Sequence, residues 1–281
     1  MQVIRSIKEM QEQALSWQRE GKRVGVVPTM GFLHEGHLSL MRLARSRCEV
    51  LVVTLFVNPS QFNSQEDLAT YPHDFDRDEA LCREVGVDVI FYPSAEEMYA
   101  PDASVWVDEE QLSRGLCGAS RPGHFRGVCT VVAKLFNITL PHLAVFGEKD
   151  AQQLRIIERM VRDLNFPVEI VRGPIVREAD GLAMSSRNHH LSASERISAL
   201  CLRKAILATE KRVEQGERSV EKLREEALRT IEPVMEAKVD YIAFVDDESL
   251  EPVEVLEKPV LMALAVWIGK TRLIDNATLH S

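Results

Sequence analysis

The chain has 281 residues, 45% of them hydrophobic, which is enough to bury one large core or two modest ones. Its 34 basic and 43 acidic residues argue against a broad binding surface for nucleic acid or for an anionic membrane. The five cysteines are scattered without a C-x-x-C pair, so we expect a reduced, cytosolic protein rather than a disulfide framework. No segment approaches the ~20 apolar residues that a membrane helix needs, and we expect no membrane partner.

Between residues 24 and about 172, short apolar runs rich in β-branched residues alternate with amphipathic segments. This alternation predicts an α/β fold with a doubly wound parallel sheet, whose ligands gather at the carboxyl ends of the strands. The expected strands are Val24–Val27, Val50–Val57, Val87–Tyr92, Leu143–Phe146 and Val168–Val171.

Beyond residue 175 the pattern changes, which predicts a second, smaller α+β domain over residues 175–281 after a first domain over residues 1–174. Ser192 and Glu195 have capping-box spacing and open an expected long helix to about Glu214, and Ser219 opens another. Two expected strands follow, Val239–Val245 and Val260–Ile268, which we interpret as an antiparallel pair.

Two histidines one helical turn apart, His34 and His37, follow the first expected strand at the start of a helix. A strand that leads through glycines into a helix start offers free main-chain N–H groups and a positive dipole end, which favour phosphate. The alternative is a surface capping turn whose imidazoles only bond main-chain groups. A metal site is disfavoured because the chain has no H-E-x-x-H and Glu35 lies off the face shared by the histidines.

Two further segments carry groups suited to phosphate. Gly147–Asp150 ends the fourth expected strand: Gly147 would let the backbone approach a nucleotide, and Lys149 supplies a point charge. Met184–Arg187 brings two hydroxyls and a guanidinium into a loop, where they suit phosphoryl oxygens. Either segment, taken alone, is equally compatible with an exposed helix start or a polar interdomain loop.

Two more segments follow the second expected strand and precede an apolar helix. Asn58 and Gln61 offer amide donors and acceptors to a small polar molecule, although Asn-Pro is also an ordinary turn. Arg121, His124 and Arg126 lie in a glycine-rich turn that is either a mobile lid bringing cations to phosphate or a simple helix entry.

Five blocks, in order and spread over nearly the whole chain, resemble the pantoate–β-alanine ligase family. Only Ser60 and Ala151 depart from it, at positions that vary in the family. The similar segments are Pro28–His37 (P-T-M-G-x-L-H-x-G-H), Phe56–Phe62 (F-V-N-P-x-Q-F), Ser120–Val128 (S-R-P-G-H-F-R-G-V), Phe146–Gln153 (F-G-E-K-D-x-Q-Q) and Asp180–Asn188 (D-G-L-A-x-S-S-R-N).

The resemblance implies a Rossmann-like nucleotidylyltransferase domain, a C-terminal domain that closes over ATP, and a homodimer. It also implies that ATP activates pantoate as pantoyl adenylate, from which β-alanine displaces AMP to give pantothenate. Mg²⁺ is expected with the triphosphate, held chiefly by substrate oxygens and water, and no metal site built from protein side chains is expected.

The resemblance also assigns roles to individual residues. His37, at the family's proton-donor position, His34 and Lys149 would act in catalysis. Gln61 and Gln153 would bind pantoate, with Gln61 also near β-alanine, and Asn58 joins this substrate-binding group. The residues expected to bind ATP are Met30, Gly31, Phe32, Leu33, His34, Glu35, Gly36, His37, Gly147, Glu148, Lys149, Asp150, Val176, Met184, Ser185, Ser186 and Arg187.

Two alternatives remain open on sequence alone. Another member of the H-x-G-H superfamily, such as a cytidylyltransferase or a fragment of an aminoacyl-tRNA synthetase, would share the histidine pair. The acidic charge and the absence of room for a tRNA-binding domain disfavour the synthetase, and the Gln61–Gln153 pair disfavours both. A catalytically silent nucleotide-binding protein would bind ATP without releasing pyrophosphate.

Overall fold

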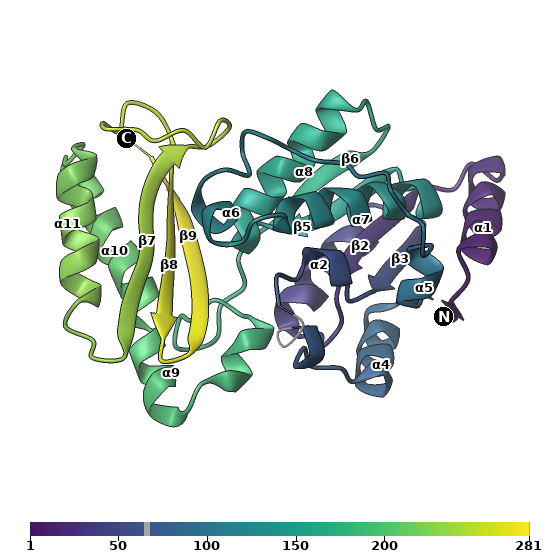
Figure 1. Ribbon diagram of the computed structural model, residues 1–281, viewed down its shortest axis with the longest axis horizontal. Coiled ribbons are helices and arrows are strands. Elements are labelled where there is room, and N and C mark those ends of the chain that lie inside the picture. Colours follow the sequence, from purple (N-terminus) through teal and green to yellow (C-terminus); the bar gives the residue numbers. More distant parts are fainter. Residues whose placement is uncertain (65–67, 281) are drawn as a thin grey trace. The chain divides into compact units, whose positions relative to one another are not determined.

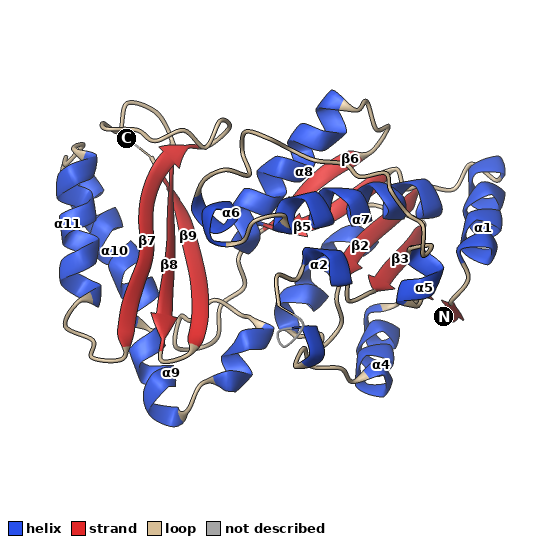
Figure 2. Cartoon of the chain, in the orientation of Figure 1, coloured by secondary structure: helices blue, strands red, loops and turns tan. Residues whose placement is uncertain are grey.

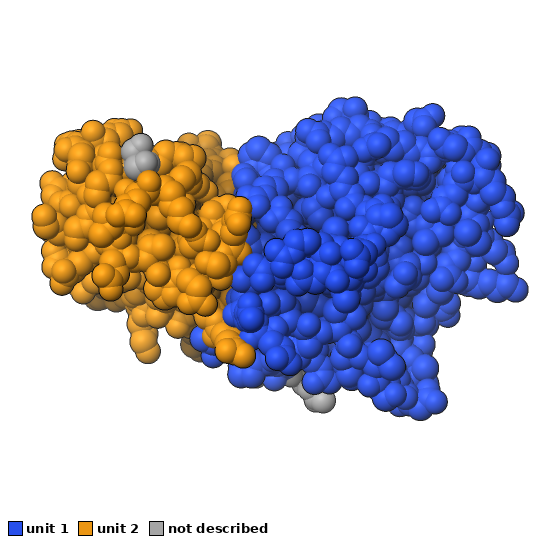
Figure 3. Space-filling view, turned by 90° about the horizontal axis from the view of Figure 1, so that it is seen from above, with its two compact units in different colours: residues 1–113, 118–148, 153–174 blue, residues 114–117, 149–152, 175–281 orange. Residues whose placement is uncertain are grey.

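The computed structural model describes residues 1–64 and 68–280, and the chain divides into two compact units. Figure 3 distinguishes the two units by colour. Unit 1 comprises Met1–Ser113, Gly118–Glu148 and Gln153–Pro174, and unit 2 comprises Arg114–Cys117, Lys149–Gln152 and Ile175–Ser281. Two short segments from before residue 175 therefore group with the C-terminal stretch.

Unit 1 is built on a six-stranded sheet in the order β1-β4-β3-β2-β5-β6, in which every neighbouring pair is parallel (Figure 1). The strands are β1 (Gln2–Ile4), β2 (Val24–Thr29), β3 (Val50–Leu55), β4 (Val89–Phe91), β5 (Leu143–Gly147) and β6 (Glu169–Gly173). All five expected strands and the parallel sheet are confirmed. The three-residue β1 was not predicted, since so short a segment carries no periodic pattern.

Both faces of this sheet are covered. Val26 and Val27 are adjacent in β2 and both fully buried, and because successive strand residues point to opposite faces, neither face meets solvent there. One face packs against α2 (Glu35–Arg45) and α4 (Phe75–Val85) in a single apolar cluster. Two other long helices of unit 1 are α1 (Ile7–Arg19) and α7 (His124–Thr139). Helix α1 contacts α7, and α7 contacts β2 (Figure 2).

Shorter helical segments complete the first part of the chain. They are η1 (Pro59–Gln61), α5 (Ala95–Met98), α6 (Leu116–Ser120) and η2 (Glu148–Asp150). A longer helix, α8 (Ala151–Asp163), follows η2. Among the described residues, no helix is both long enough and apolar enough to cross a membrane.

Unit 2 contains a three-stranded antiparallel sheet in the order β7-β8-β9, with β7 (Ala237–Asp246), β8 (Val260–Ile268) and β9 (Thr271–Leu279). The expected antiparallel pair is confirmed as β7 and β8. In β8, Met262 and Leu264 belong to one apolar cluster and Leu261 and Ala263 to another, so the two faces of the strand pack separately.

The helices of unit 2 are η3 (Ser186–His190), α9 (Ala193–Ala199), α10 (Cys201–Glu214) and α11 (Val220–Ile231). The Ser192–Glu195 capping box is confirmed, with both reciprocal hydrogen bonds present. Ser219 precedes α11 at its N-cap position, as expected, although its side chain makes no capping hydrogen bond. The prediction of a single long helix to Glu214 was wrong, because the helix is interrupted at Leu200. Its N–H bonds the carbonyl of Ile197, a tighter 3₁₀-type turn that separates α9 from α10.

The order of the strands positions the candidate site. β2 lies between β3 and β5: the chain continues from β2 to β3 and β4 on one side of it, whereas β5 and β6 lie on the other side. In open α/β sheets, ligands bind beyond the carboxyl ends of the strands at such a switch point. The sequence blocks that begin at Met30, Asn58 and Gly147 all follow or end these three adjacent strands.

Candidate active site

The segment between β2 and α2 reverses direction through two consecutive residues in left-handed conformation, Gly31 (φ 84) and Phe32 (φ 50). Its main-chain N–H groups are fixed by side chains. Gly31 N donates to Thr29 Oγ1 at 3.2 Å, and the N–H groups of Phe32 and Leu33 donate to the two carboxylate oxygens of Asp78, each at 2.7 Å. We call residues 30–37 the histidine loop.

His34 and His37 form a reciprocal capping box at the start of α2. Gly36 N donates to His34 Nδ1 at 3.2 Å, and His34 N donates to His37 Nδ1 at 3.3 Å. A main-chain N–H can only donate, so both Nδ1 atoms are acceptors and each neutral ring carries its proton on Nε2. The ring centroids lie 4.1 Å apart, with the ring planes tilted by 38°.

One part of the sequence interpretation was wrong. We expected free main-chain N–H groups around the histidines, but those of residues 31 to 34 and of Gly36 are hydrogen bonded within the protein. The two histidines can cap the helix and also bind a ligand, because the capping hydrogen bonds use only the Nδ1 atom of each ring. The groups suited to phosphate are therefore the imidazole Nε2–H donors and the positive end of α2.

Asn58 and Gln61 lie together at the end of β3, as the sequence predicted. Asn58, 1% exposed, donates from Nδ2 to Gln61 Oε1 at 3.1 Å, and Gln61 Nε2 donates to Met30 Sδ at 3.1 Å. Tyr99 Oη donates to Asn58 Oδ1 at 2.8 Å, and burial raises the pKa of its phenol. No sequence motif pointed to Tyr99, since its role depends on a contact 41 residues away.

The glycine-rich turn leads directly into α7, with Gly123 at the N-cap position. His124 is buried and its Nδ1 lies 2.8 Å from the carbonyl oxygen of Gln61, while Arg121 Nη1 lies 3.2 Å from His124 Nε2. A guanidinium can only donate, so Nε2 accepts and Nδ1–H donates to Gln61. A Cβ at Gly127 would lie 2.5 Å from the carbonyl oxygen of Ser60, so glycine is what allows η1 to pack this closely.

The remaining predicted residues of unit 1 lie at the end of β5 and on α8. A Cβ at Gly147 would meet only Leu40 Cδ1, at an ordinary 3.7 Å, so its protein neighbours among the described residues do not require glycine there. Glu148 follows it in η2, and Gln153 is half-buried in the first turn of α8.

In unit 2, the segment 177–188 is held as a structured hairpin. Arg177 pairs with Ala183, and its guanidinium makes two bonds to the buried Asp275, at 2.7 and 2.9 Å. Arg196 bonds Glu178 at 2.8 Å and Asp180 at 2.6 Å, and its hydrogen bond lowers the pKa of Glu178. These ion pairs fix the loop that carries Met184–Arg187.

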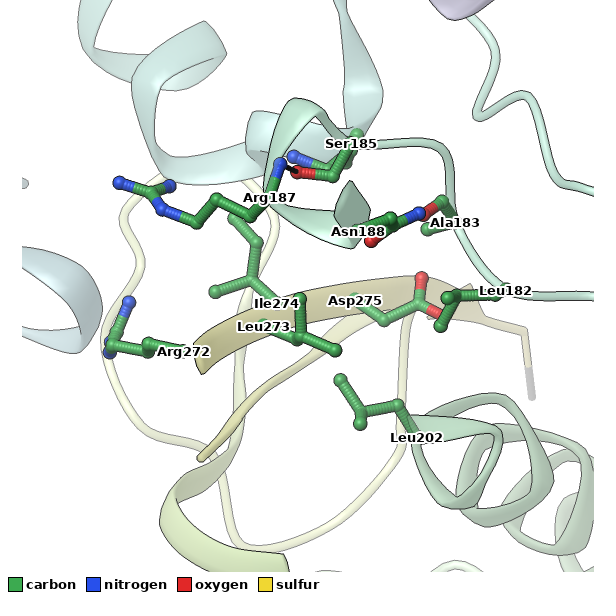
Figure 4. A pocket seen from close by; sticks show the side chains of 11 residues that line it. Leu182, Ala183, Ser185, Arg187, Asn188, Leu202, Arg272, Leu273, Ile274 and Asp275 are labelled. Carbon is green, nitrogen blue, oxygen red and sulfur yellow. Dashed lines mark hydrogen bonds between the residues drawn. The ribbon is translucent and has the colours of Figure 1, made fainter. Parts of the chain in front are cut away.

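Three cations and a hydroxyl line one pocket of unit 2. Lys149, Arg187 and Arg272 share it with Ser185 and Asn188, and Figure 4 shows the guanidinium groups of Arg187 and Arg272 on the same side. Such a group of donors suits phosphoryl oxygens. Sequence reasoning missed Arg272 because β9, which carries it, was not predicted.

The other predicted residues of unit 2 adjoin this pocket. Met184 N donates to the carbonyl oxygen of Val176 at 3.0 Å, and Ser185 caps the turn that contains Ser186. Asn276 Nδ2 donates to the carbonyl oxygen of Lys149 at 2.9 Å, which fixes the backbone beneath the lysine. Lys149 Nζ lies 3.5 Å from a carboxylate oxygen of Asp150.

The comparison with known families decides the assignment. The model of the family described as pantoate-beta-alanine ligase matches residues 2–278. The chain belongs to the pantoate–β-alanine ligase family.

Curated relatives in this family match over their full length. The chain is 54% identical over 279 residues to the pantothenate synthetase of Thermotoga petrophila, covering 99% of this chain and 100% of the relative. It is 56% identical over 276 residues to the pantothenate synthetase of Heliobacterium modesticaldum, with 98% of each covered. This match along the full length of curated ligases supports the ligase assignment over the two alternatives that the sequence left open.

Solved pantoate–β-alanine ligases share the fold. Pantothenate synthetase from Thermus thermophilus has a TM-score of 0.95, 43% identity and complete coverage of both chains. Pantoate-beta-alanine ligase from Francisella tularensis, solved with beta-gamma ATP and beta-alanine, has a TM-score of 0.80 and 33% identity, covering 99% of this chain and 97% of that one. The Rossmann-like doubly wound domain with a smaller α+β domain is thereby confirmed.

Proposed function

We propose that this ligase uses residues of each unit, assigned separately below, for a reaction in which ATP activates pantoate and β-alanine then displaces AMP. The family fixes the overall reaction, (R)-pantoate plus β-alanine plus ATP giving pantothenate, AMP and pyrophosphate. The observation that carries the residue assignments is the fixed pair of Nε2–H donors at the carboxyl end of β2, in the same unit as the amide of Gln61.

In the first step, the carboxylate of pantoate attacks the α-phosphorus of ATP. A P–O bond forms, the bond to the β-phosphate breaks, and pyrophosphate leaves with the bonding electron pair. We assign His34 and His37 to the phosphate oxygens, where neutral Nε2–H groups stabilise the negative charge that develops. His37, the expected proton donor, would act through the same Nε2–H. The protein needs no nucleophile, because positioning and charge stabilisation supply the catalysis.

We assign the remaining ATP contacts to both units. Unit 1 would contribute the backbone of residues 30–37 and 147–148, and unit 2 would contribute Lys149 and Asp150, Val176 and the segment Met184–Arg187. The pocket shared by Lys149, Ser185 and Arg187 supports this assignment for the triphosphate. In this proposal residues 1–174 form the nucleotide-binding domain, and residues 175–281 close over ATP and protect the adenylate from water.

We assign pantoate to Gln61, Gln153 and the neighbouring Asn58, with β-alanine also near Gln61. The amide of Gln61 has a defined orientation because Asn58 and Met30 each bond one of its ends. In the second step, the amine of β-alanine attacks the acyl carbon, an amide bond forms, and AMP leaves as the amine loses a proton.

Mg²⁺ is expected to neutralise charge on the triphosphate. Among residues 1–64 and 68–280, no three His, Cys, Asp or Glu side chains are grouped to hold a metal ion. The donor set of the proposed triphosphate site is cationic, which fits an ion held by substrate oxygens and water.

We further propose a cytoplasmic homodimer. All five cysteines are free thiols, which suits a reducing compartment, and the apolar side chains of Val105 and Trp106 are exposed on an extended segment. Sedimentation equilibrium of the purified protein tests the dimer: a concentration-independent monomer mass would contradict it.

The assay that tests the residue-level proposal measures both half-reactions. Pantoate, ATP and Mg²⁺ alone should release pyrophosphate, and AMP and pantothenate should accumulate only when β-alanine is added. AMP formation that does not depend on β-alanine, or pyrophosphate release that does not depend on pantoate, would contradict the proposed order of steps.

A further inference from the structure

Asp78 is a buried carboxylate close to the histidine loop that the mechanism above does not use. It lies on α4, is 2% exposed, and bonds the main-chain N–H groups of two successive residues, Phe32 and Leu33, at 2.7 Å each. Burying a carboxylate is costly, and burial does raise the pKa of Asp78 while the two N–H bonds lower it. Because burying the Asp78 carboxylate costs free energy, we expect this side chain to serve a function.

The backbone that Asp78 holds is strained. Phe32 has φ 50, a left-handed conformation that is unfavourable for a non-glycine residue. Two charge-assisted hydrogen bonds, donated by main-chain N–H groups to one carboxylate, offset that cost. The Arg77 guanidinium also lies 5.3 Å from the centre of the Phe32 ring, so α4 contacts this residue through both its backbone and its side chain.

A second tether comes from β2 itself. Thr29 Oγ1 accepts the N–H of Gly31 at 3.2 Å and donates to the carbonyl oxygen of Thr54 on the neighbouring strand at 2.8 Å. Three successive N–H groups, at residues 31, 32 and 33, are therefore fixed immediately before the capping box of His34 begins.

We propose that Asp78, assisted by Thr29, is a positioning residue that sets the histidine loop in register for adenylyl transfer. It touches neither substrate in this proposal, which rests on the function proposed above. Because the tethers end at Leu33, one residue before His34, releasing them would let both Nε2–H donors move relative to the sheet. A misplacement of about 1 Å can cost on the order of 100-fold in rate.

The test compares two isosteric carboxylate replacements. Asp78→Asn keeps one acceptor oxygen but turns an NH₂ group toward the second main-chain N–H. Asp88→Asn is the matched control, because Asp88 also accepts a main-chain N–H, that of Leu51 at 2.7 Å, but at the amino end of the sheet. Thermal unfolding of both variants measures how much each carboxylate contributes to the stability of the fold, separately from any effect on activity.

Two half-reactions separate positioning from folding. Pantoate-dependent exchange of pyrophosphate into ATP measures adenylyl transfer, and pantothenate formation from chemically prepared pantoyl adenylate and β-alanine measures the second step. We expect Asp78→Asn to lower the exchange rate about 100-fold with KM for pantoate within about twofold, and the second step to fall less than about threefold. Asp88→Asn should leave both near wild type.

An equal fall in both half-reactions, or an exchange rate like that of Asp88→Asn, would overturn the proposal. If Asp78→Asn does not fold, Thr29→Val decides: we expect about tenfold slower exchange with KM unchanged, and wild-type exchange would overturn it. Wild-type enzyme without pantoate-dependent exchange would instead contradict the proposed function, so the two failures are distinguishable.

Discussion

Gln61 donates a hydrogen bond from its side-chain amide to the sulfur of Met30 at 3.1 Å, and this bond joins the end of β3 to the histidine loop after β2. Asn58 holds the other end of the same amide. The side-chain amide of Gln61, which we propose binds pantoate, therefore has one orientation. It is set by Asn58, which follows β3, and by Met30, which follows β2. Its orientation is fixed before substrate arrives, which is the basis of the first prediction.

Asn58→Ala should raise KM for pantoate about fivefold and leave KM for ATP unchanged, since a hydrogen bond of about 1 kcal/mol that orients Gln61 is lost. Steady-state kinetics with each substrate varied in turn measure this. Asn63→Ala is the control, because Asn63 Nδ2 donates to the carbonyl oxygen of the exposed Pro122 at 2.7 Å, close by in the structure. A larger change in KM for ATP than for pantoate would contradict the assignment.

Gly127→Ala should destabilise the protein and weaken pantoate use. Alanine normally favours a helix interior, but here its Cβ would overlap Ser60 O at 2.5 Å and displace η1, at a cost of about 1–3 kcal/mol. Gly115→Ala is the matched control, since a Cβ there meets no described atom within 4 Å. We expect a lower unfolding midpoint and a lower kcat/KM for pantoate in the first variant only; equal behaviour of the two would refute this reasoning.

His37→Ala should lower kcat by about 100-fold or more while weakening ATP binding much less, because its Nε2–H acts on charge that develops in the transition state. Equilibrium binding of ATP and single-turnover rates separate the two effects. His142→Ala is the control: His142 Nδ1 also accepts a main-chain N–H, that of Val24 at 3.0 Å, but at the amino end of β2. Equal losses in binding and rate would make His37 a binding residue only.

Three of the five thiols should resist modification in the native protein. Burial raises the pKa of Cys82 and Cys129 to about 12 and that of Cys201 to about 11, so almost no thiolate forms at about pH 8. Cys48 and Cys117 are only half-buried. Peptide mapping after brief treatment with a thiol reagent should find label at these two sites first, and early label at Cys82 would show that its surroundings open readily.

Acid should weaken unit 2 through Glu178. Its pKa is lowered from 4.5, chiefly by the hydrogen bond from Arg196, so its stabilising contribution is present above about pH 4.5 and is lost as pH falls through the depressed value. The pair is partly exposed, so we expect less than about 1 kcal/mol. Chemical denaturation between about pH 7 and pH 3 should show a shallower loss for Arg196→Met; an unchanged slope would exclude this pair.

Sequence patterns predicted the elements whose burial follows a simple period. The strands at Val24, Val50 and Leu143 are predominantly apolar, and their covered faces match that composition. β9 escaped prediction because Asp275 and Asn276 interrupt its pattern, and both are buried where they bond Arg177 and the Lys149 backbone. Buried polar residues with long-range partners carry no local signal.

The same limit applies to the candidate site. His34, His37, Gln61 and Lys149 could be proposed from motifs, since each follows a predicted strand. Asp78 could not, because its role depends on a turn 45 residues earlier in the chain. The error about free N–H groups has the same origin: the sequence locates the helix start but does not show which distant side chain occupies its donors.

The histidine capping box couples the start of a helix to the choice of tautomer. When α2 forms, both imidazoles already present Nε2–H, so no proton has to be relocated when ATP arrives. Both capping hydrogen bonds use Nδ1 as the acceptor, so the capping geometry itself selects the Nε2–H tautomer of each neutral ring. His34→Ser with His37→Glu would restore an ordinary capping box and remove both donors, yielding a protein with an intact helix and no adenylyl transfer.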